Sequence, residues 1–432
     1  MGLSGAVPLL LAGRVNYKGQ ALFSLASLPF SLKLVWAPIV DSSKVRGFGR
    51  RKSWLVPTQL LIGTSMVLAR SSIDAWMTLP DMRKLTALFL GLYFLCATQD
   101  IAVDGWALTM LSEKNVGWGP TSNSLGQSLG FALSYVGFVA LHDEATCNKY
   151  FRAVPAEGGL VSLADFVGWC GWAFLATTTV VAFTPEIDAE EPERISVAYA
   201  RAARTLRLGP MRALCVLLLT CRAAFGAADA ATALKAIDYG LRKEDVAFLS
   251  PVLLAASVVF PLVCARWTTR TPLRAFLVAV PLRLLLNPVT WAVLEYVKRG
   301  RPNHFAAFAI LSLSKEFAAN LMFVSQMSFF ARISDPLYGG TFMTLLNTVA
   351  NLGAKWPPSL ALFLLDPLSK RVQDAFKLEL FVSTIVGFVW LLWATPRLKR
   401  LDSLPLARWR PKLYLKKNGD NSSESSNGNH DH

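Results

Sequence analysis

Long apolar runs separated by short polar segments dominate this chain. A run near 20 residues is long enough to cross the hydrocarbon core of a bilayer as a helix. Eleven such runs predict membrane-spanning helices, at Gly19–Val40, Trp54–Ala69, Leu85–Leu111, Gly117–Leu141, Leu163–Phe183, Met211–Ala233, Val246–Ala265, Ala275–Tyr296, Phe305–Ala331, Gly340–Leu365 and Leu378–Thr395. A shorter run, Gly2–Ala12, is expected to be the second part of a truncated first helix. The predicted fold class is an all-α polytopic membrane protein.

Composition agrees with this class. Of the 432 residues, 53% are hydrophobic and only 17% are charged. A soluble protein of two or three domains carries about 25% charged residues. The composition therefore argues against a soluble enzyme.

The longest polar connection, Thr184–Arg212, divides the chain into two halves of six segments, the partial one included. We predict an N-terminal half (1–183), a cytosolic linker (184–210), a C-terminal half (211–396) and a cytosolic tail (397–432). Two six-helix halves joined by a charged linker are typical of the major facilitator superfamily, in which the halves rock around a central site. A loop of a channel or receptor is the alternative.

One loop supports the superfamily only weakly. Asp41 and the Gly49–Lys52 segment resemble the conserved loop between the second and third helices, but Asp41 is farther from Gly49 than that motif allows.

Orientation depends on the tail. Lys and Arg are nearly balanced between the loops of the two sides, and the basic tail places the linker in the cytosol. The tail is interpreted as a topological anchor rather than a nucleic-acid or phosphoinositide patch. Its end, 418–432, is expected to be disordered.

Two carboxylates, Asp100 and Asp104, lie inside the predicted Leu85–Leu111 helix. A charged residue at the centre of a bilayer costs about 2.5–3.5 kcal/mol on insertion scales. A spacing of four puts both on one helix face, directed together into a bundle or a wet cavity. This pattern indicates an ion or substrate pathway.

Five cations also fall inside the predicted spans, against four acids. The cations are Lys33, Arg222, Arg283, Lys315 and Lys355, and the acids are Asp100, Asp104, Asp229 and Glu316. A slightly positive interior suits a phosphate-bearing ligand. The alternative is that each cation pairs with an acid as a folding contact, or reaches the interface from a helix end.

Catalysis in the membrane is not predicted. An intramembrane aspartyl protease needs acids on two helices and a Gly-x-Gly-Asp element, which the chain lacks. The histidines lie near loops or in the tail, and the cysteines have no metal spacing. We therefore expect no enzyme activity, no cofactor and no metal site.

Several motifs identify a family. The run Thr98–Leu111, TQDIAVDGWALTML, resembles the hallmark of the acetyl-coenzyme A transporters of the endoplasmic reticulum, and Ser334–Gly353 agrees with it. Smaller similar blocks are Pro29–Lys33, Gly49–Gln59, Cys147–Tyr150, Trp356–Pro357 and Asp366–Pro367. The resemblance implies a major facilitator fold in the reticulum membrane. It also implies movement of acetyl-CoA from cytosol to lumen for acetylation there.

The resemblance and the embedded charges together suggest a site. Its substrate-binding candidates are Lys33, Arg222, Arg283, Lys355, Gln99, Trp106, Asn347, Asn351 and Trp356. Because acetyl-CoA is anionic, Asp100, Asp104, Asp229 and Glu316 are assigned to coupling or gating. The expected partners are acetyl-CoA and the lipid bilayer, with no nucleic acid; a homodimer is left open.

Two departures from the family leave alternatives open. The polar N-terminal segment is absent, and the loop at Asp366–Lys377 is short and lacks cysteine. A transport-dead truncated scaffold is one alternative. A proton-coupled muropeptide-type permease is another, because that permease shares a Gln-Asp-x-x-x-Asp-x-Trp element; Thr109–Leu111 and Asn347–Asn351 favour acetyl-CoA.

Overall fold

The computed structural model describes residues 7, 22–23, 25–45, 49–78, 81–112, 114–186, 194–335, 338–372 and 374–409. Helices and short connections make up this part of the chain, and it contains no strand. The predicted all-α fold is confirmed. The predicted partial helix at Gly2–Ala12, apart from Val7, and the tail after Trp409 lie outside the described residues.

The N-terminal half is built around three long helices and several short ones. Its elements are η1 (Leu25–Ser27), α3 (Leu28–Leu32), η2 (Lys33–Val35), α4 (Ala37–Ser42), α5 (Lys52–Thr78), α6 (Met82–Met110), α7 (Trp118–Phe131), the π-helical turn η3 (Ala132–Gly137), α8 (Phe138–His142), α9 (Glu144–Tyr150) and α10 (Leu163–Phe183).

A separate helix in the linker, α11 (Ile195–Arg207), leads into the C-terminal half. The elements of that half are α12 (Gly209–Thr220), η4 (Ala223–Phe225), α13 (Gly226–Asp238), α14 (Lys243–Arg270), α15 (Pro272–Lys298), α16 (His304–Ile333), α17 (Gly339–Ser369), α18 (Ala375–Asp402) and η6 (Leu406–Arg408).

Eight helical segments of the described chain are long and apolar enough to cross a membrane. The predicted count of eleven is therefore not confirmed. Two further predicted spans correspond to α5 and α17, which have 27 and 31 residues but are not among the eight. The predicted Gly19–Val40 span is, where described, a series of short helices that includes η2 and α4.

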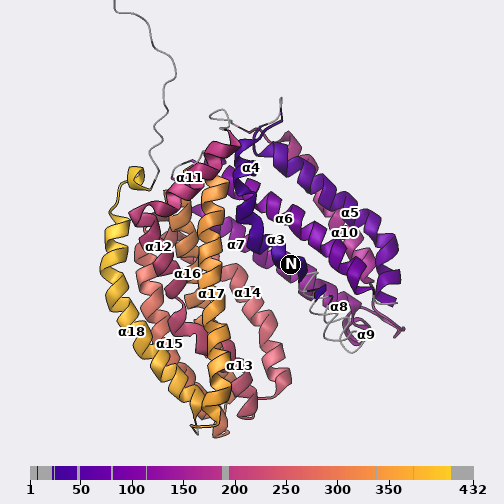
Figure 1. Cartoon of the computed structure of the whole chain (residues 1–432). Coiled ribbons are helices and arrows are strands. Elements are labelled where there is room, and N and C mark those ends of the chain that lie inside the picture. The colour runs from indigo at the N-terminus through magenta and orange to yellow at the C-terminus, as the bar shows by residue number, and fades with distance from the viewer. Residues whose placement is uncertain are drawn as a thin grey trace, which may run out of the picture.

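The helices form two groups joined at one end, and α11 lies across that end (Figure 1). Within the N-terminal group, α5 and α10 pack closely because glycines face each other. A Cβ on Gly171 would lie 2.8 Å from the Gly63 carbonyl oxygen. In the C-terminal group, α15 packs between α16 and α18.

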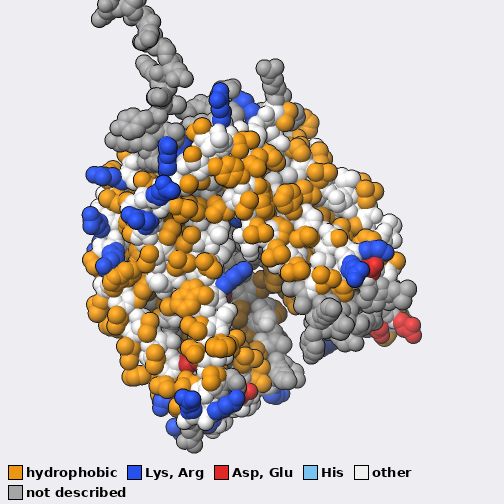
Figure 2. All heavy atoms as spheres, in the orientation of Figure 1, with side chains coloured by type: hydrophobic (Ala, Val, Ile, Leu, Met, Phe, Trp, Pro, Cys, Tyr) orange, Lys and Arg blue, Asp and Glu red, His pale blue; other side chains and the backbone are white. Residues whose placement is uncertain are grey.

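The two groups contact each other through α4 and α6 against α17, and through α7 against α14 and α16. Figure 2 shows the molecule hollowed between the groups on the side away from α11. The structure is therefore closed on the linker side and open on the opposite side.

Candidate functional site

The first helix of the C-terminal half is broken near its middle. Between α12 and α13 the chain makes a turn at Cys221 and Arg222, followed by the short helix η4. A break frees backbone carbonyls, which are costly to leave unpaired inside a membrane. Side chains from two other helices satisfy them: Trp356 Nε1 lies 2.8 Å from the Leu219 oxygen, and Asn287 Nδ2 lies 2.9 Å from the Ala224 oxygen.

Charged side chains gather just beyond this break. Arg283 on α15 is buried, donates to Asp229 on α13 at 2.6 Å, and lies over the Phe225 ring, with Cζ 4.5 Å from its centre. Lys315 on α16 donates to the Ala228 carbonyl at 2.7 Å and to a neighbouring threonine hydroxyl. The break therefore brings together charged residues from three of the predicted spans.

Arg222 differs from its neighbours. It is half-buried at the break and within electrostatic reach of Arg283 and Asp229. Among the described residues no side chain or carbonyl forms a hydrogen bond or ion pair with its guanidinium. An Arg held at this depth without a protein partner is available to an anion.

The N-terminal half has a corresponding pair. Lys33, in η2, is buried and forms an ion pair with Asp100 on α6. In both halves the cation is almost covered and the acid is partly exposed: the side chains of Lys33 and Asp100 are 6% and 27% exposed. The values for Arg283 and Asp229 are 7% and 31%.

Asp104 lies one turn further along α6 and faces the other half. It is 7% exposed, and Asn347 on α17 donates to it at 3.4 Å. This weak hydrogen bond joins α6 to α17 and thus crosses between the halves. The predicted common face for Asp100 and Asp104 holds, but the two acids have different partners.

A tighter junction lies closer to the linker. Asp41, at 0% exposure, forms an ion pair with Arg51 and accepts a hydrogen bond of 2.6 Å from the Thr341 backbone N–H in the first turn of α17. A carboxylate at a helix N-terminus is stabilised by the free N–H groups and the helix dipole. Asp41 therefore fastens the N-terminal half to the start of α17.

The loop that carries Arg51 is held from the end of α10. Glu186 accepts hydrogen bonds from the backbone N–H groups of Arg51 (2.7 Å) and Lys52 (2.9 Å), and the Lys52 ammonium donates to the Thr184 carbonyl at 2.8 Å. These contacts hold Arg51 beside Asp41, although the sequence spacing of the two residues departs from the expected motif. The spacing was therefore a poor guide to this contact.

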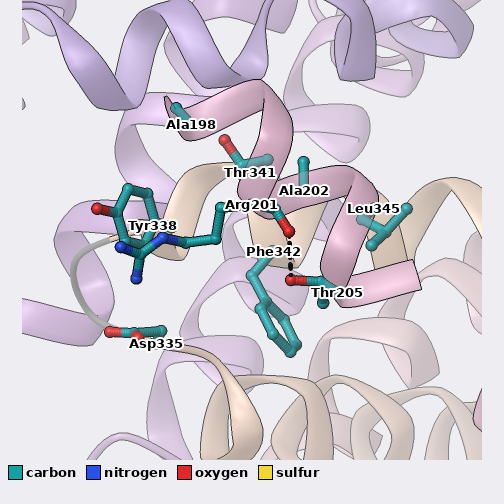
Figure 3. A pocket seen from close by; sticks show the side chains of 9 residues that line it. All are labelled: Ala198, Arg201, Ala202, Thr205, Asp335, Tyr338, Thr341, Phe342 and Leu345. Carbon is teal, nitrogen blue, oxygen red and sulfur yellow. Dashed lines mark hydrogen bonds between the residues drawn. The ribbon is translucent and has the colours of Figure 1, made fainter. Parts of the chain in front are cut away.

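The linker helix covers the junction. The Tyr199 hydroxyl of α11 donates to the Val35 carbonyl in the N-terminal half. Arg201 lies over the ring of Tyr338, which precedes α17, with Cζ 4.1 Å from its centre. Figure 3 shows the small pocket between α11 and α17, and the Thr205 hydroxyl donating to the Arg201 carbonyl at 2.9 Å. Its lining residues are Ala198, Arg201, Ala202, Thr205, Asp335, Tyr338, Thr341, Phe342 and Leu345.

The remaining predicted residues lie outside these clusters. Trp106 is 8% exposed within an apolar cluster, and Gln99 is half-buried. Asn351 and Lys355 are exposed on α17. Glu316 is half-buried and accepts a hydrogen bond of 2.8 Å from Asn320 one turn later. Their assigned roles stay predictions.

Sequence reasoning missed the importance of Asp41, Thr341 and Glu186. The available signal was Pro185-Glu186 at the end of an apolar run together with the Asp41–Lys52 loop. Only the folded chain shows that Asp41 contacts Thr341 and that Glu186 binds the backbone beside Arg51, the partner of Asp41.

Two helical halves closed at one end, with buried charges on facing helices and a hollow at the other end, define a membrane transporter of the major facilitator class. Solved structures agree. The chain is similar to the Escherichia coli fucose:proton symporter (TM-score 0.61, 11% identity, 92% of this chain and 95% of that one). It is also similar to the human organic anion transporter MFSD10 (TM-score 0.53, 16% identity, 92% and 89%).

The sequence identifies a narrower group than the fold does. The family model described as acetyl-coenzyme A transporter 1 matches residues 1–193, 185–277 and 290–387. The chain belongs to this family. It is 31% identical to an uncharacterized protein of Schizosaccharomyces pombe over 95% of this chain and 85% of that protein. It is 28% identical over 144 residues to the anhydromuropeptide permease of Escherichia coli, covering 31% of this chain and 28% of the permease.

Proposed function

We propose that this protein carries acetyl-CoA across the endoplasmic reticulum membrane, from cytosol to lumen, by alternating access. Membership of the acetyl-CoA transporter family supports the substrate, and the two-halved fold supports the mechanism. With the linker in the cytosol, the described state is open to the lumen.

The single observation that carries the proposal is Arg222. It offers a guanidinium at mid-depth, next to the α12–α13 break, that no described residue engages. Guanidinium groups bind phosphate oxygens through paired, charge-assisted hydrogen bonds. Acetyl-CoA carries such phosphates, so Arg222 is the proposed first anchor, with Lys33, Arg283 and Lys355 as further cations.

The partly exposed acids are proposed to control access to the cations behind them. Asp229 holds Arg283, and Asp100 holds Lys33. An anionic substrate competes with these carboxylates for the same cations. Protonation of Asp100 or Asp229 would release its cation and so couple transport to protons. Asp104 and Glu316, which accept hydrogen bonds from Asn347 and Asn320, are proposed to act in gating.

The test is uptake of radiolabelled acetyl-CoA into proteoliposomes containing the full chain. Loss of one charge-assisted contact, worth about 1.5–3 kcal/mol, should raise the KM of Arg222→Gln by roughly 10- to 150-fold. Arg222→Lys should retain part of the affinity, and Arg371→Gln, an exposed cation, should behave as wild type. Unchanged uptake by folded Arg222→Gln protein would overturn the anchor. No saturable uptake by the wild-type chain would instead favour a transport-dead scaffold.

A muropeptide-type permease is the second candidate, because the anhydromuropeptide permease matches part of the chain. Excess anhydromuropeptide and excess free CoA, added separately to the same assay, separate the two. Inhibition by CoA alone is expected. Saturable uptake of the muropeptide, with none of acetyl-CoA, would establish the alternative.

A further inference from the structure

Exposed cations are numerous at the linker end of the C-terminal half. Consecutive spans alternate in direction, so the start of α12, the end of α14, the start of α15 and the end of α18 all lie at this end. Six exposed cations there define the linker-end basic surface: Arg204, Arg207, Arg266, Arg270, Arg274 and Lys399. Within the described part of the chain, none of the six forms an ion pair or side-chain hydrogen bond.

The opposite end of the same half is organised differently. There Lys235 pairs with Asp238 at 3.1 Å, Arg242 with Asp245 at 2.8 Å, and Arg299 with Glu295 at 3.0 Å. Exposed cations are common on any protein, and local acids usually lie beside them. The opposite end therefore balances part of its exposed charge locally, although Lys298, Arg301 and Arg371 form no ion pair there in the described chain. The six cations of the linker-end basic surface balance none of theirs in this way.

Figure 2 shows Lys and Arg side chains gathered at this end of the C-terminal half, with no acidic side chain among them in that view. At the same end Arg332 pairs with Asp402, at 3.5 Å, but Asp402 forms no ion pair with any of the six cations. The surface therefore keeps a positive potential that nearby carboxylates do not cancel.

Exposed apolar side chains border the same surface. Trp267, between Arg266 and Arg270, is 59% exposed, and Leu206, beside Arg207, is 40% exposed. On α18, the Arg397 guanidinium lies over the ring of Trp393, with Cζ 4.3 Å from its centre. Exposed Trp next to cations is the arrangement found at the level of lipid headgroups.

We propose that the linker-end basic surface binds anionic phospholipids, with the phosphate or carboxylate of the headgroup on the Arg side chains and the acyl chains on the adjoining apolar surface. Charge complementarity gives the headgroup class, and the exposed Trp267 and Leu206 distinguish a lipid from a soluble anion. The cytosolic leaflet, in which the linker is predicted to lie, is the one rich in such lipids. This proposal does not depend on the transported substrate.

The test is native mass spectrometry of the purified full chain titrated with phosphatidylserine or phosphatidylcholine. The wild type is expected to bind phosphatidylserine at least tenfold more tightly. The triple variant Arg266→Gln/Arg270→Gln/Arg274→Gln should lose that preference, since each cation near an anionic surface contributes about a fivefold change in affinity. All three residues are exposed, so the melting temperature of the triple variant should stay within about 2 °C of that of the wild type.

The matched control removes three exposed cations from the opposite end, in Lys298→Gln/Arg301→Gln/Arg371→Gln. It should keep the preference for phosphatidylserine. Equal loss in both triple variants, or no preference in the wild type, would overturn the proposal. Equally tight binding of soluble glycerophosphoserine, which has no acyl chains, would overturn it as well by showing a site for a free anion.

Discussion

Replacing Gly340 by alanine should open the linker side of the transporter. Gly340 is the second residue of α17, and a Cβ there would lie 2.7 Å from Asp41 Oδ1 and 2.7 Å from the Ile101 carbonyl oxygen. Both oxygens belong to the N-terminal half. The added methyl group therefore clashes only while the two halves are joined on the linker side.

The size of the effect follows from the geometry. Cβ atoms rarely approach other heavy atoms within 3.0 Å, so the start of α17 must retreat from α4 and α6. Overpacking of this kind costs about 1–3 kcal/mol. Alanine also favours the helix by about 1 kcal/mol, but equally in both states, so this gain cancels. The ratio of open to closed linker side should rise by roughly 5- to 150-fold.

Double electron–electron resonance measures this ratio directly. Spin labels at Val45 in the N-terminal half and Arg270 in the C-terminal half are both exposed near the junction. In a background without native cysteines, Gly340→Ala should shift the distance distribution toward longer separations. Gly126→Ala on α7, where a Cβ meets nothing within 4 Å, is the matched control. An unchanged distribution in folded Gly340→Ala protein, or the same shift in the control, would refute the reasoning.

Three further outcomes are expected. Gly353→Ala, whose Cβ would lie 2.9 Å from a backbone Cα of α12, should lower the melting temperature in a thermal scan by about 2–4 °C or more, whereas Gly126→Ala should not. Asp229→Asn leaves the buried guanidinium of Arg283 uncompensated and should lower the free energy of unfolding by about 3–5 kcal/mol in a denaturation series. The double variant Asp229→Asn/Arg283→Gln should recover part of this loss, and a double variant no more stable than Asp229→Asn contradicts the reasoning. Tyr199→Phe removes one hydrogen bond of α11, worth about 0.5–1.5 kcal/mol, so backbone hydrogen exchange across residues 195–207 should accelerate. Equal exchange rates in the variant and the wild type would show that this bond does not hold α11 in place.

Apolar run length predicted much of this architecture. The predicted span Leu163–Phe183 coincides with α10. The predicted span Leu85–Leu111 begins inside α6 and ends one residue after it, and Phe305–Ala331 lies inside α16. Run length works because a lipid-exposed backbone must satisfy its own hydrogen bonds, which leaves a helix as the default. It fails at the α12–α13 break, since there the freed carbonyls are satisfied by Trp356 and Asn287 from distant parts of the sequence.

The charged residues show the same division. The sequence identified Asp100, Arg222 and Arg283 because a charge inside an apolar run is costly and therefore informative. It could not assign partners, because pairing depends on how helices face each other. Asp41 was harder still: it lies at the edge of an apolar run, and its importance comes from the start of α17, 300 residues away in sequence.

The positions of the charges divide their roles between binding and switching. Lys33 with Asp100, and Arg283 with Asp229, are pairs within one half, so the rocking of the halves does not itself break them. The contact of Asp41 with Thr341 joins different halves and must break when the linker side opens, at a cost of about 1.5–3 kcal/mol for a charge-assisted hydrogen bond. Substitutions in the pairs should therefore change stability and substrate affinity, whereas substitutions at the junction should change the balance between the two open states.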